Sequence, residues 1–202
     1  MSGAGDRIAG TFSGRGRARA RPLRHLAVLA LLLASAWPAR ADDLSVSVVL
    51  REKIYQVRGR FTTLASRDTV WRVLTDYERI PGFVGSMKHS TVEHRDGPRV
   101  RVNQSASIGV FPIRKTARLA LDVFEEQPNR LAFRDTLGQD FRLYSGSWEL
   151  QSDSARTTVI YTLEATPKAP VPSWIGRSMM SHAASDLLRQ VHAEIERRAI
   201  AR

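Results

Sequence analysis

The spacing of apolar residues divides the chain into two helical segments and a run of strands. After Ser66, a residue suited to N-capping, the apolar side chains fall on one helical face: Val70, Val73, Leu74 and Tyr77. Pro81 and Gly82 end this helix or turn it into a second short one. A longer helical stripe runs from Trp174 to about Arg198, after a proline-rich approach.

Elsewhere apolar and polar residues alternate, which is the pattern of half-buried strands. The expected strands cover residues 44–61, 87–94, 99–108, 113–125, 130–135, 141–151 and 157–165. Short connectors rich in Gly, Pro, Asn and Asp separate most of them, so neighbouring strands should be antiparallel. We interpret residues 44–61 as one long or bent strand, with a break at Gly59 that is typical of a bulge.

The C-terminal helical stripe must be covered by another apolar surface, and the inner face of the sheet is the nearest one. We therefore predict an α+β fold in which a curved antiparallel sheet of about six to seven strands wraps around a long C-terminal helix. One or two short helices should follow the first strand, and Ser173 can cap the long helix. Because helices bracket the strands rather than alternate with them, the usual nucleotide-binding sheets are excluded.

The first 41 residues have the features of a secretory signal peptide. A basic segment precedes a continuous apolar run at residues 26–36, and Ala39 and Ala41 are small residues at the positions that a signal peptidase reads. The run is shorter than the roughly 20 apolar residues of a membrane-spanning helix. We expect cleavage after Ala41 and a periplasmic or secreted product, residues 42–202, of one domain. A retained anchor is the alternative, and the length of the basic lead-in leaves the true start codon open.

Composition narrows the functional classes once this segment is set apart. The net charge of +11 falls to +5 without residues 1–41, which hold seven arginines and one aspartate, so much of the basicity belongs to the export signal. Basic residues are scattered along the strands rather than interleaved with stacking aromatics, and we expect no nucleic-acid binding. The chain has no cysteine, which excludes disulfides, thiol chemistry and a lipid-modified cysteine.

Catalytic signatures are few. His89 and His94 are an odd number apart and should point to opposite faces of a strand, so a metal pair there is not expected. His182 and Asp186 could form a dyad at helical spacing, although such pairs are routine on surfaces. Asp140, Arg142 and Glu149 could place charge inside the sheet, or pair across its rim or fix a turn. We predict no catalytic residue, no metal and no cofactor.

Two blocks of the sequence resemble the START-like, helix-grip (SRPBCC) superfamily. The first runs from Val70 through Asp76 and Tyr77 to Phe83, and the second is QDFRLYSGSWEL at residues 139–150. A proline-led terminal helix with paired leucines at 187 and 188 completes the resemblance, which covers about residues 46–198. The chain is most similar to the polyketide cyclase/dehydrase and coenzyme Q-binding branch, with Gln139 as a minor departure from its pattern.

The resemblance implies a hydrophobic cavity between the sheet and the C-terminal helix. Ligands of such cavities include lipids, isoprenoid quinones, sterols and polyketides, but the family shares no catalytic motif that could be transferred to this chain. The candidate ligand-binding residues come from the expected inward positions: Phe83, Val84, Phe111, Phe133, Phe141, Trp148, Tyr161, Met179, Met180, Ala183 and Leu187. The apolar loops at residues 83–85 and 108–113 could form a gate or touch a membrane surface, or they could pack as ordinary core.

The function that follows is a hypothesis with two alternatives. An exported, soluble protein that carries or protects a lipid, an isoprenoid quinone or a similar hydrophobic small molecule is the first choice. A cyclase or dehydratase acting on a polyketide-like substrate in the same cavity is the second, and it requires an inward acid–base pair. The third is an envelope interaction module that holds no ligand. The ligand, the partner proteins and the oligomeric state are not predictable from these residues.

Overall fold

The computed structural model describes residues 44–110 and 113–201. The expected signal peptide and Phe111 lie outside these residues. The strands are β1 (Ser45–Arg51), β2 (Ile54–Thr63), β3 (Met87–Asp96), β4 (Arg99–Val110), β5 (Ile113–Glu126), β6 (Arg130–Asp135), β7 (Phe141–Ser152) and β8 (Thr157–Pro167). The helices are α1 (Arg67–Leu74), the 3₁₀ helix η1 (Tyr77–Gly82) and the 28-residue α2 (Ser173–Ile200).

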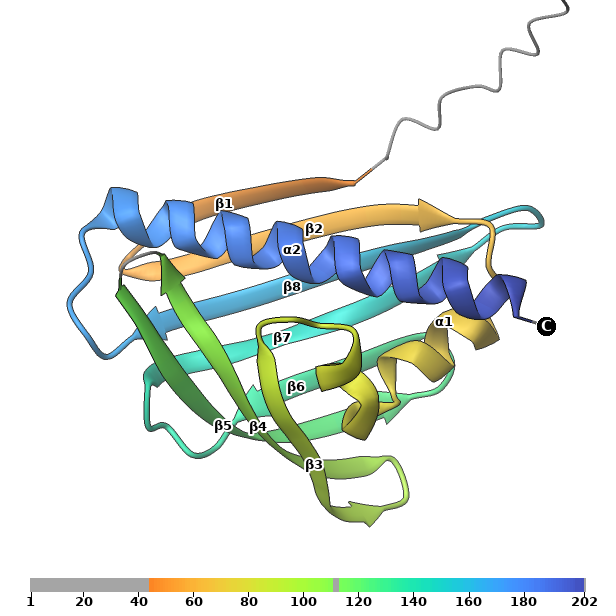
Figure 1. Ribbon diagram of the computed structural model, residues 1–202, viewed down its shortest axis with the longest axis horizontal. Helices are drawn as coiled ribbons and strands as arrows, with labels where there is room; N and C mark the ends of the chain where they lie inside the picture. Colours follow the sequence, from red (N-terminus) through yellow and green to blue (C-terminus); the bar gives the residue numbers. More distant parts are fainter. Residues whose placement is uncertain (1–43, 111–112, 202) are drawn as a thin grey trace, which may run out of the picture. The chain divides into compact units, whose positions relative to one another are not determined.

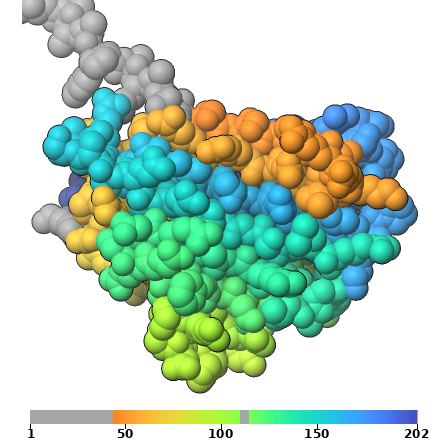
Figure 2. Space-filling model, turned by 180° about the vertical axis from the view of Figure 1, so that it is seen from behind, coloured from red at the N-terminus to blue at the C-terminus, as the bar shows by residue number. Residues whose placement is uncertain are grey.

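The described strands form one antiparallel sheet, and α2 crosses its inner face (Figure 1). The strand order is β1-β2-β8-β7-β6-β5-β4-β3, so β2 pairs with β8 rather than with the next strand in the chain. The short helices α1 and η1 lie near the C-terminal part of α2 (Figure 1). The face of the sheet that does not contact α2 forms the outer surface of the protein, as the view from behind shows (Figure 2). This arrangement confirms the predicted α+β helix-grip fold.

The sheet has eight described strands rather than six to seven, because residues 44–61 are not one strand. They form the β1–β2 hairpin, in which Arg51 pairs with Ile54 across a two-residue turn. Both turn residues, Glu52 and Lys53, have positive φ values of 49° and 67°, the conformation that tight hairpin turns require. Gly and Asn are the residues usually found in this conformation, so the sequence lacked the usual turn signal.

Close packing of α2 on β2 explains why two positions, 59 and 176, are occupied by glycine. A Cβ atom on Gly59 would lie 2.3 Å from Cδ1 of the fully buried Leu188, and one on Gly176 would lie 2.0 Å from Oη of Tyr55. Gly59 continues the regular pairing of β2 with β1 and β8, so the predicted bulge is wrong. The glycine instead leaves room for the helix.

We expect Gly176→Ala to destabilise the fold by about 1–3 kcal/mol, the usual cost of overpacking a filled site. Tyr55 is buried and has little space to move, so the first turn of α2 would have to shift. Urea denaturation would measure the loss. Gly82→Ala is the matched control, because its Cβ would meet no atom within 4 Å. An equal effect of both substitutions would show that space beside Tyr55 is not the cause.

The two helix starts differ in their capping. Ser66 caps α1 as predicted, and its Oγ accepts a 3.3 Å hydrogen bond from the Thr69 backbone N–H. Ser173 does not cap α2, because the helix begins at Ser173 itself and Pro172 holds the N-cap position without a side-chain bond. The buried stripe of α2 includes Ala184, Leu188, Val191 and Ile195.

In residues 44–110 and 113–201, no helix is both long and apolar enough to span a bilayer.

Candidate functional site

A cavity of about 110 Å³ lies between the inner face of the sheet, η1 and α2. Its walls come from α1, η1 and the segment after it, from β3 to β8, and from two positions of α2. The lining side chains are Val73, Leu74, Tyr77, Ile80, Phe83, Val84, Met87, Val102, Gln104, Leu121, Val123, Leu131, Phe133, Tyr144, Trp148, Tyr161, Leu187 and Val191. The wall is therefore almost entirely apolar and aromatic, which is typical of small-molecule sites.

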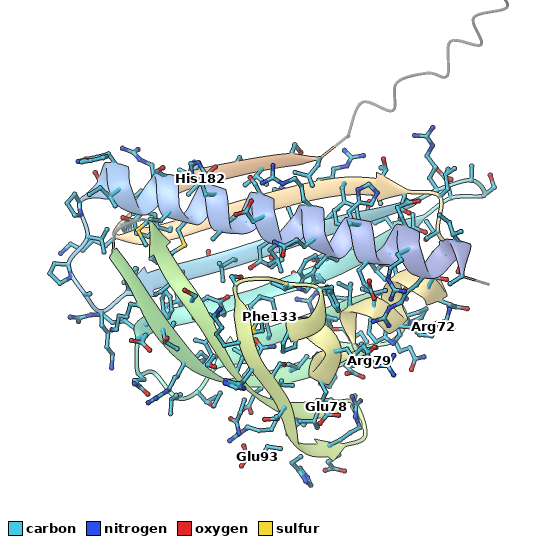
Figure 3. All side chains as sticks on the ribbon, in the orientation of Figure 1. Arg72, Glu78, Arg79, Glu93, Phe133 and His182 are labelled. Atoms are coloured by element: carbon cyan, nitrogen blue, oxygen red, sulfur yellow. The ribbon has the colours of Figure 1, made fainter. Side chains whose placement is uncertain are left out.

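Six of the predicted ligand-binding residues line this cavity. They are Phe83, Val84, Phe133, Trp148, Tyr161 and Leu187, and Phe133 lies over the inner face of the sheet (Figure 3). Their contact with a ligand stays a prediction. Phe141 is buried beside the cavity, with its ring 5.0 Å from that of Tyr144.

The three ligand-binding residues predicted near the start of α2 do not line this cavity. Met179 and Met180 are half-buried, and Met180 packs against the core without lining the cavity. The inward prediction for Ala183 is wrong, because Ala183 is exposed and Ala184 is buried in its place. One residue along a helix turns the side chain by about 100°, so an error of one position moves it from the core to the surface.

Sequence reasoning missed Tyr144, which provides one of the few polar groups of the cavity. Tyr144 lies two and four residues before Gly146 and Trp148, on the same side of a regular strand. The strand alternation in the second motif block could therefore have identified Tyr144 as an inward residue. Phe141 also reaches the inner side despite its odd spacing, because the pairing of β7 with β8 shifts register between Phe141 and Leu143.

Tyr144 and Tyr161 form a hydrogen-bonded phenol pair within an aromatic cluster. The Tyr161 ring lies 4.6 Å from that of Trp148 and 6.3 Å from that of Phe133. Burial raises the pKa of Tyr144 to about 12 and the pKa of Tyr161 well above its usual value of 10.0. The contact between the two hydroxyls lowers the pKa of Tyr144 and raises that of Tyr161.

This pairing leaves one phenol proton for a guest. Each tyrosine carries one O–H donor, and a hydrogen bond between the two hydroxyls uses only one of the two protons. The Tyr144 hydroxyl can then donate to an acceptor oxygen in the cavity. Both phenols stay neutral across the physiological pH range, so the pair can act as a hydrogen-bond donor but not as an anionic base.

The other polar side chains of the wall are bound to protein partners. The Tyr77 hydroxyl donates to Oε1 of Glu125 at 2.6 Å, and burial followed by this contact raises the pKa of Tyr77. Nε2 of Gln104 donates to Oγ of Ser90 at 3.1 Å. Both groups therefore already donate a hydrogen bond to a protein partner.

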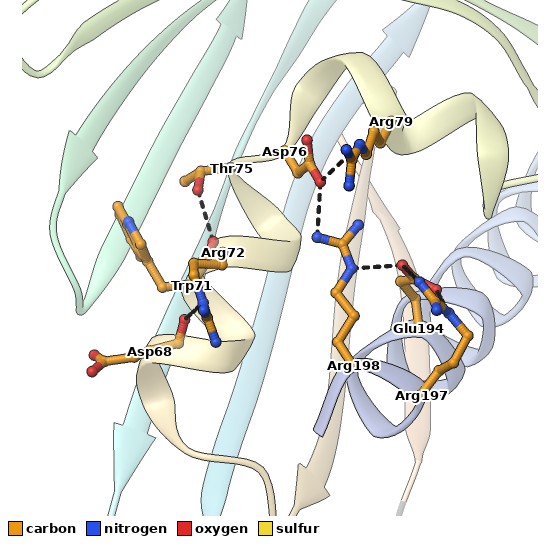
Figure 4. Close-up of polar contacts among 9 residues, drawn as sticks. All are labelled: Asp68, Trp71, Arg72, Thr75, Asp76, Arg79, Glu194, Arg197 and Arg198. Atoms are coloured by element: carbon orange, nitrogen blue, oxygen red, sulfur yellow. Dashed lines mark hydrogen bonds and ion pairs between the residues drawn. The ribbon is translucent and has the colours of Figure 1, made fainter. Parts of the chain in front are cut away.

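One side of the cavity is held closed by contacts between α2 and the segment around η1. The backbone N–H of Gly85 donates to Oε1 of Gln190 at 2.6 Å. Arg198 donates to Oδ2 of Asp76 at 2.8 Å and to Oε1 of Glu194 at 2.6 Å (Figure 4), while its guanidinium lies 5.9 Å from the ring centre of Phe83. Phe83 thus contacts both the cavity and the ion-pair network that ties η1 to the helix.

The candidate acid–base residues lie elsewhere and have structural partners. His182 lies on the exposed side of α2 (Figure 3) and its Nδ1 is 2.8 Å from the Ser178 carbonyl oxygen. Asp186 pairs with Arg189, so the two residues do not form a dyad. Within residues 44–110 and 113–201, no cluster of three or more His, Asp or Glu side chains could hold a metal ion.

Two charged residues of the second motif block, Asp140 and Glu149, make contacts to the strands β5 and β6. Asp140 is buried and accepts from Nζ of Lys115 at 2.7 Å and from the Arg118 backbone N–H at 3.0 Å. Both contacts lower the pKa of Asp140, with the Lys115 hydrogen bond as the larger cause. Glu149 lies 3.6 Å from Arg130. Asp140 and Glu149 therefore pair with Lys115 and Arg130, and the exposed Arg142, which was expected to pair with one of them, is the partner of neither.

Solved structures with the same fold include proteins of several activities. The chain is similar to a START superfamily protein from Mycobacterium smegmatis, with a TM-score of 0.62, 16% identity, and coverage of 70% of this chain and 97% of that one. It is similar to the Zhui aromatase/cyclase from Streptomyces sp. R1128, with a TM-score of 0.60, 19% identity, and coverage of 72% and 95%. It is also similar to a STAR-related lipid transfer protein from Xanthomonas axonopodis, with a TM-score of 0.57, 16% identity, and coverage of 77% and 99%.

At these identities the similarity establishes the fold and not the activity. A search of curated proteins finds no match for the chain. A comparison with protein families does find one: the family described as polyketide cyclase / dehydrase and lipid transport matches residues 64–192, which run from just after β2 into the C-terminal half of α2. The chain belongs to the polyketide cyclase / dehydrase and lipid transport family.

Proposed function

We propose that this protein binds a hydrophobic small molecule carrying at least one acceptor oxygen, and that it carries or protects this molecule. The observation that supports the proposal is the apolar, aromatic cavity whose wall contains the Tyr144–Tyr161 phenol pair. Burial of apolar ligand surface would drive binding, at about 25 cal/mol per Å². The Tyr144 hydroxyl would favour ligands with a carbonyl or hydroxyl group.

Binding is preferred to catalysis because the wall offers no acid–base pair. The described lining residues include no Asp, Glu, His, Lys or Arg, and their polar members are Tyr77, Gln104, Tyr144 and Tyr161. Each of these four is hydrogen-bonded to a protein group. A cyclase or dehydratase would need a group that changes its protonation state within reach of the substrate.

The size of the cavity favours a compact ligand or the ring of a longer one. Pockets for drug-sized ligands have volumes of about 300–1,000 Å³, and this cavity has about 110 Å³. A long lipid chain would need the segment around η1 to move away from α2. The contacts of Gly85 with Gln190 and of Asp76 with Arg198 are the ones that such an opening must break.

We also propose that the protein acts outside the cytoplasm, after cleavage at Ala41. The basic segment, the apolar run and the small residues before the cleavage position support this proposal. N-terminal sequencing of protein recovered from the periplasm would test it. A mature chain that begins at Asp42 is expected, and protein that stays in the cytoplasm with Met1 intact would contradict the proposal.

Naphthalene and 1,4-naphthoquinone are matched probes for the cavity, because they share a flat apolar ring system and differ in two carbonyl oxygens. Isothermal titration calorimetry should show saturable binding of one molecule of either probe per chain. Naphthoquinone is expected to bind more tightly, since its carbonyl can accept from Tyr144. Absence of saturable binding of both probes would contradict the proposed function.

Tyr144→Phe should weaken naphthoquinone binding about 2- to 12-fold and leave naphthalene binding unchanged. This range corresponds to the 0.5–1.5 kcal/mol of a typical hydrogen bond. Tyr77→Phe is the matched control, because the Tyr77 hydroxyl already donates to Glu125. Equal losses for the two probes in the Tyr144 variant would show that ring packing, and not the hydroxyl, is responsible.

A further inference from the structure

The N-terminal end of α2 meets the ends of several strands at one side of the molecule (Figure 1). Gly176 in the first turn of α2 packs on Tyr55 at the start of β2. The Thr166 hydroxyl at the end of β8 donates to the Lys53 carbonyl in the β1–β2 turn at 3.4 Å. The Lys168 backbone N–H donates to the Asp140 carbonyl, just before β7, at 3.0 Å. These contacts place residues that are far apart in sequence on one continuous surface.

Six exposed cations lie on this surface, which we call the basic end. They are Arg51, Lys53, Lys115, Arg142, Lys168 and Arg177. Among the residues that the structure describes, only Lys115 of these six is within ion-pair distance of a carboxylate, that of Asp140. The other five present their charge to solvent.

The four acidic groups near the basic end, Glu52, Asp135, Asp140 and Glu164, are fewer than its six cations and offset only part of this charge. Asp135 is occupied by three backbone N–H groups, those of Ala120, Leu137 and Gly138, at 3.0–3.1 Å. Asp140 is occupied by Lys115 and the Arg118 backbone. Glu164 accepts from Gln56, which leaves Glu52 as the exposed carboxylate without such a contact among the described residues.

The opposite end of the molecule is different. There Arg130 pairs with Glu126 at 2.8 Å, Arg197 with Glu194 at 2.7 Å, and Arg198 with Asp76 at 2.8 Å. These three arginines are each paired with a carboxylate of the same chain. At the basic end, by contrast, five of the six cations have no carboxylate partner among the described residues.

Trp174 adds an apolar group to the basic end. Its side chain is 70% exposed, whereas Trp71 and Trp148 are 5% and 8% exposed. Leu137, in the turn before β7, is 48% exposed at the same end. An indole ring surrounded by Lys and Arg fits the boundary between lipid headgroups and acyl chains, where Trp is enriched and cations meet anionic headgroups.

We propose that the basic end is a docking surface for a membrane that contains anionic lipids, with Trp174 inserted at the headgroup level. Lys53 and Arg177 flank the insertion and contact phosphates. The surface is separate from the cavity wall, so the proposal does not depend on which ligand the cavity holds. Docking would bring the protein to a lipid source or target without crossing the bilayer.

Vesicle co-sedimentation of the protein purified after expression of the full chain tests the proposal. Vesicles of phosphatidylcholine with about one third phosphatidylglycerol should bind the protein, and pure phosphatidylcholine vesicles should not. The double substitution Lys53→Glu with Arg177→Glu should lower partitioning by at least about 30-fold, since each basic side chain near an anionic surface contributes roughly fivefold. Trp174→Ala should lower it about tenfold, and added salt should weaken binding further by screening.

The matched control is Arg58→Glu with Arg60→Glu, which makes the same change in charge at two exposed positions on the outer face of β2. This control should bind as the unchanged protein does. Quenching of tryptophan emission by doxyl-labelled lipid should disappear in Trp174→Phe. All five substituted positions are exposed, and thermal unfolding would verify that each variant is folded.

Three outcomes would overturn the proposal. The first is no binding to anionic vesicles, and the second is equal loss in the control pair, which would indicate a dependence on net charge alone. The third is binding to polyglutamate or DNA that is as tight as binding to vesicles and is unchanged in Trp174→Ala. That result would indicate that the partner is an acidic macromolecule and not a membrane. A failure of the proposed ligand function would look different, because loss of probe binding in the cavity would leave vesicle binding intact.

Discussion

Leu187→Trp is expected to reduce binding of naphthalene and 1,4-naphthoquinone by about 60-fold. Leu187 lines the cavity from the middle of α2, and Phe133, Trp148 and Tyr161 of the sheet line the same cavity. An indole at this position would fill space that the ligand needs. Loss of roughly 100 Å² of buried ligand surface corresponds to about 2.5 kcal/mol, which is the stated change in affinity. Calorimetric titration with both probes measures it.

Ala183→Trp is the control on the same helix. Ala183 is exposed, one helical turn before Leu187, and a tryptophan there should leave both affinities unchanged. Circular dichroism and thermal unfolding would show whether each variant keeps its fold. Unchanged affinity in a folded Leu187→Trp variant would mean that the ligand lies outside the cavity described above.

Glu194→Gln is expected to lower the free energy of unfolding by about 3 kcal/mol at neutral pH. Glu194 is buried at the C-terminal part of α2, where its oxygens accept from Arg197 at 2.7 and 2.8 Å and from Arg198 at 2.6 Å (Figure 4). The hydrogen bonds from Arg197 are the largest cause that lowers the pKa of Glu194 from 4.5 to about 2. A shift of this size corresponds to about 3 kcal/mol at 1.36 kcal/mol per unit.

The sign of the pH dependence follows from the lowered pKa. Above pH 4.5 the carboxylate is charged in both states, and its full stabilisation is present. As the pH falls from 4.5 towards 2, the unfolded chain takes up a proton that the folded chain does not, so stability is lost. Urea denaturation across this range should show a steeper fall for the unchanged protein than for Glu194→Gln.

Glu126→Gln is the matched control for this network. Glu126 accepts from Arg130 at 2.8 Å, but both side chains are more than 40% exposed. Exposed pairs contribute less than about 1 kcal/mol. If the two substitutions had equal effects on stability and on its pH dependence, the Glu194 network would not hold η1 to α2 in the way described.

The arrangement of the elements could be predicted from the sequence because the hydrophobic periods are strong. At residues 99–108, apolar and polar residues alternate along the whole strand, and after Trp174 the apolar stripe continues over several helical turns. Each pattern gives its element one buried face. The β1–β2 hairpin could not be predicted in the same way. Its turn is formed by Glu52 and Lys53, and the energy that holds them at positive φ comes from strand pairing rather than from local preference.

The cavity wall was partly predictable for a related reason. Aromatic residues in regular strands, such as Phe133 and Trp148, take their direction from the strand period. Ala183 was misplaced because the orientation of a wide helical stripe is fixed only by packing, here by Leu188 against Gly59. The Tyr144–Tyr161 pair requires two strands in register, with Tyr144 opposite Ala165 and Tyr161 opposite Trp148, which no local pattern specifies.

Native mass spectrometry of the protein purified after expression of the full chain tests the central claim most directly. We predict a mass above that of the polypeptide, from one apolar molecule with an acceptor oxygen that organic extraction releases and identifies. The same preparation of Leu187→Trp should lack this molecule, and Ala183→Trp should retain it. Polypeptide mass alone in repeated preparations, together with no uptake of added 1,4-naphthoquinone, would contradict the claim that this cavity binds a ligand.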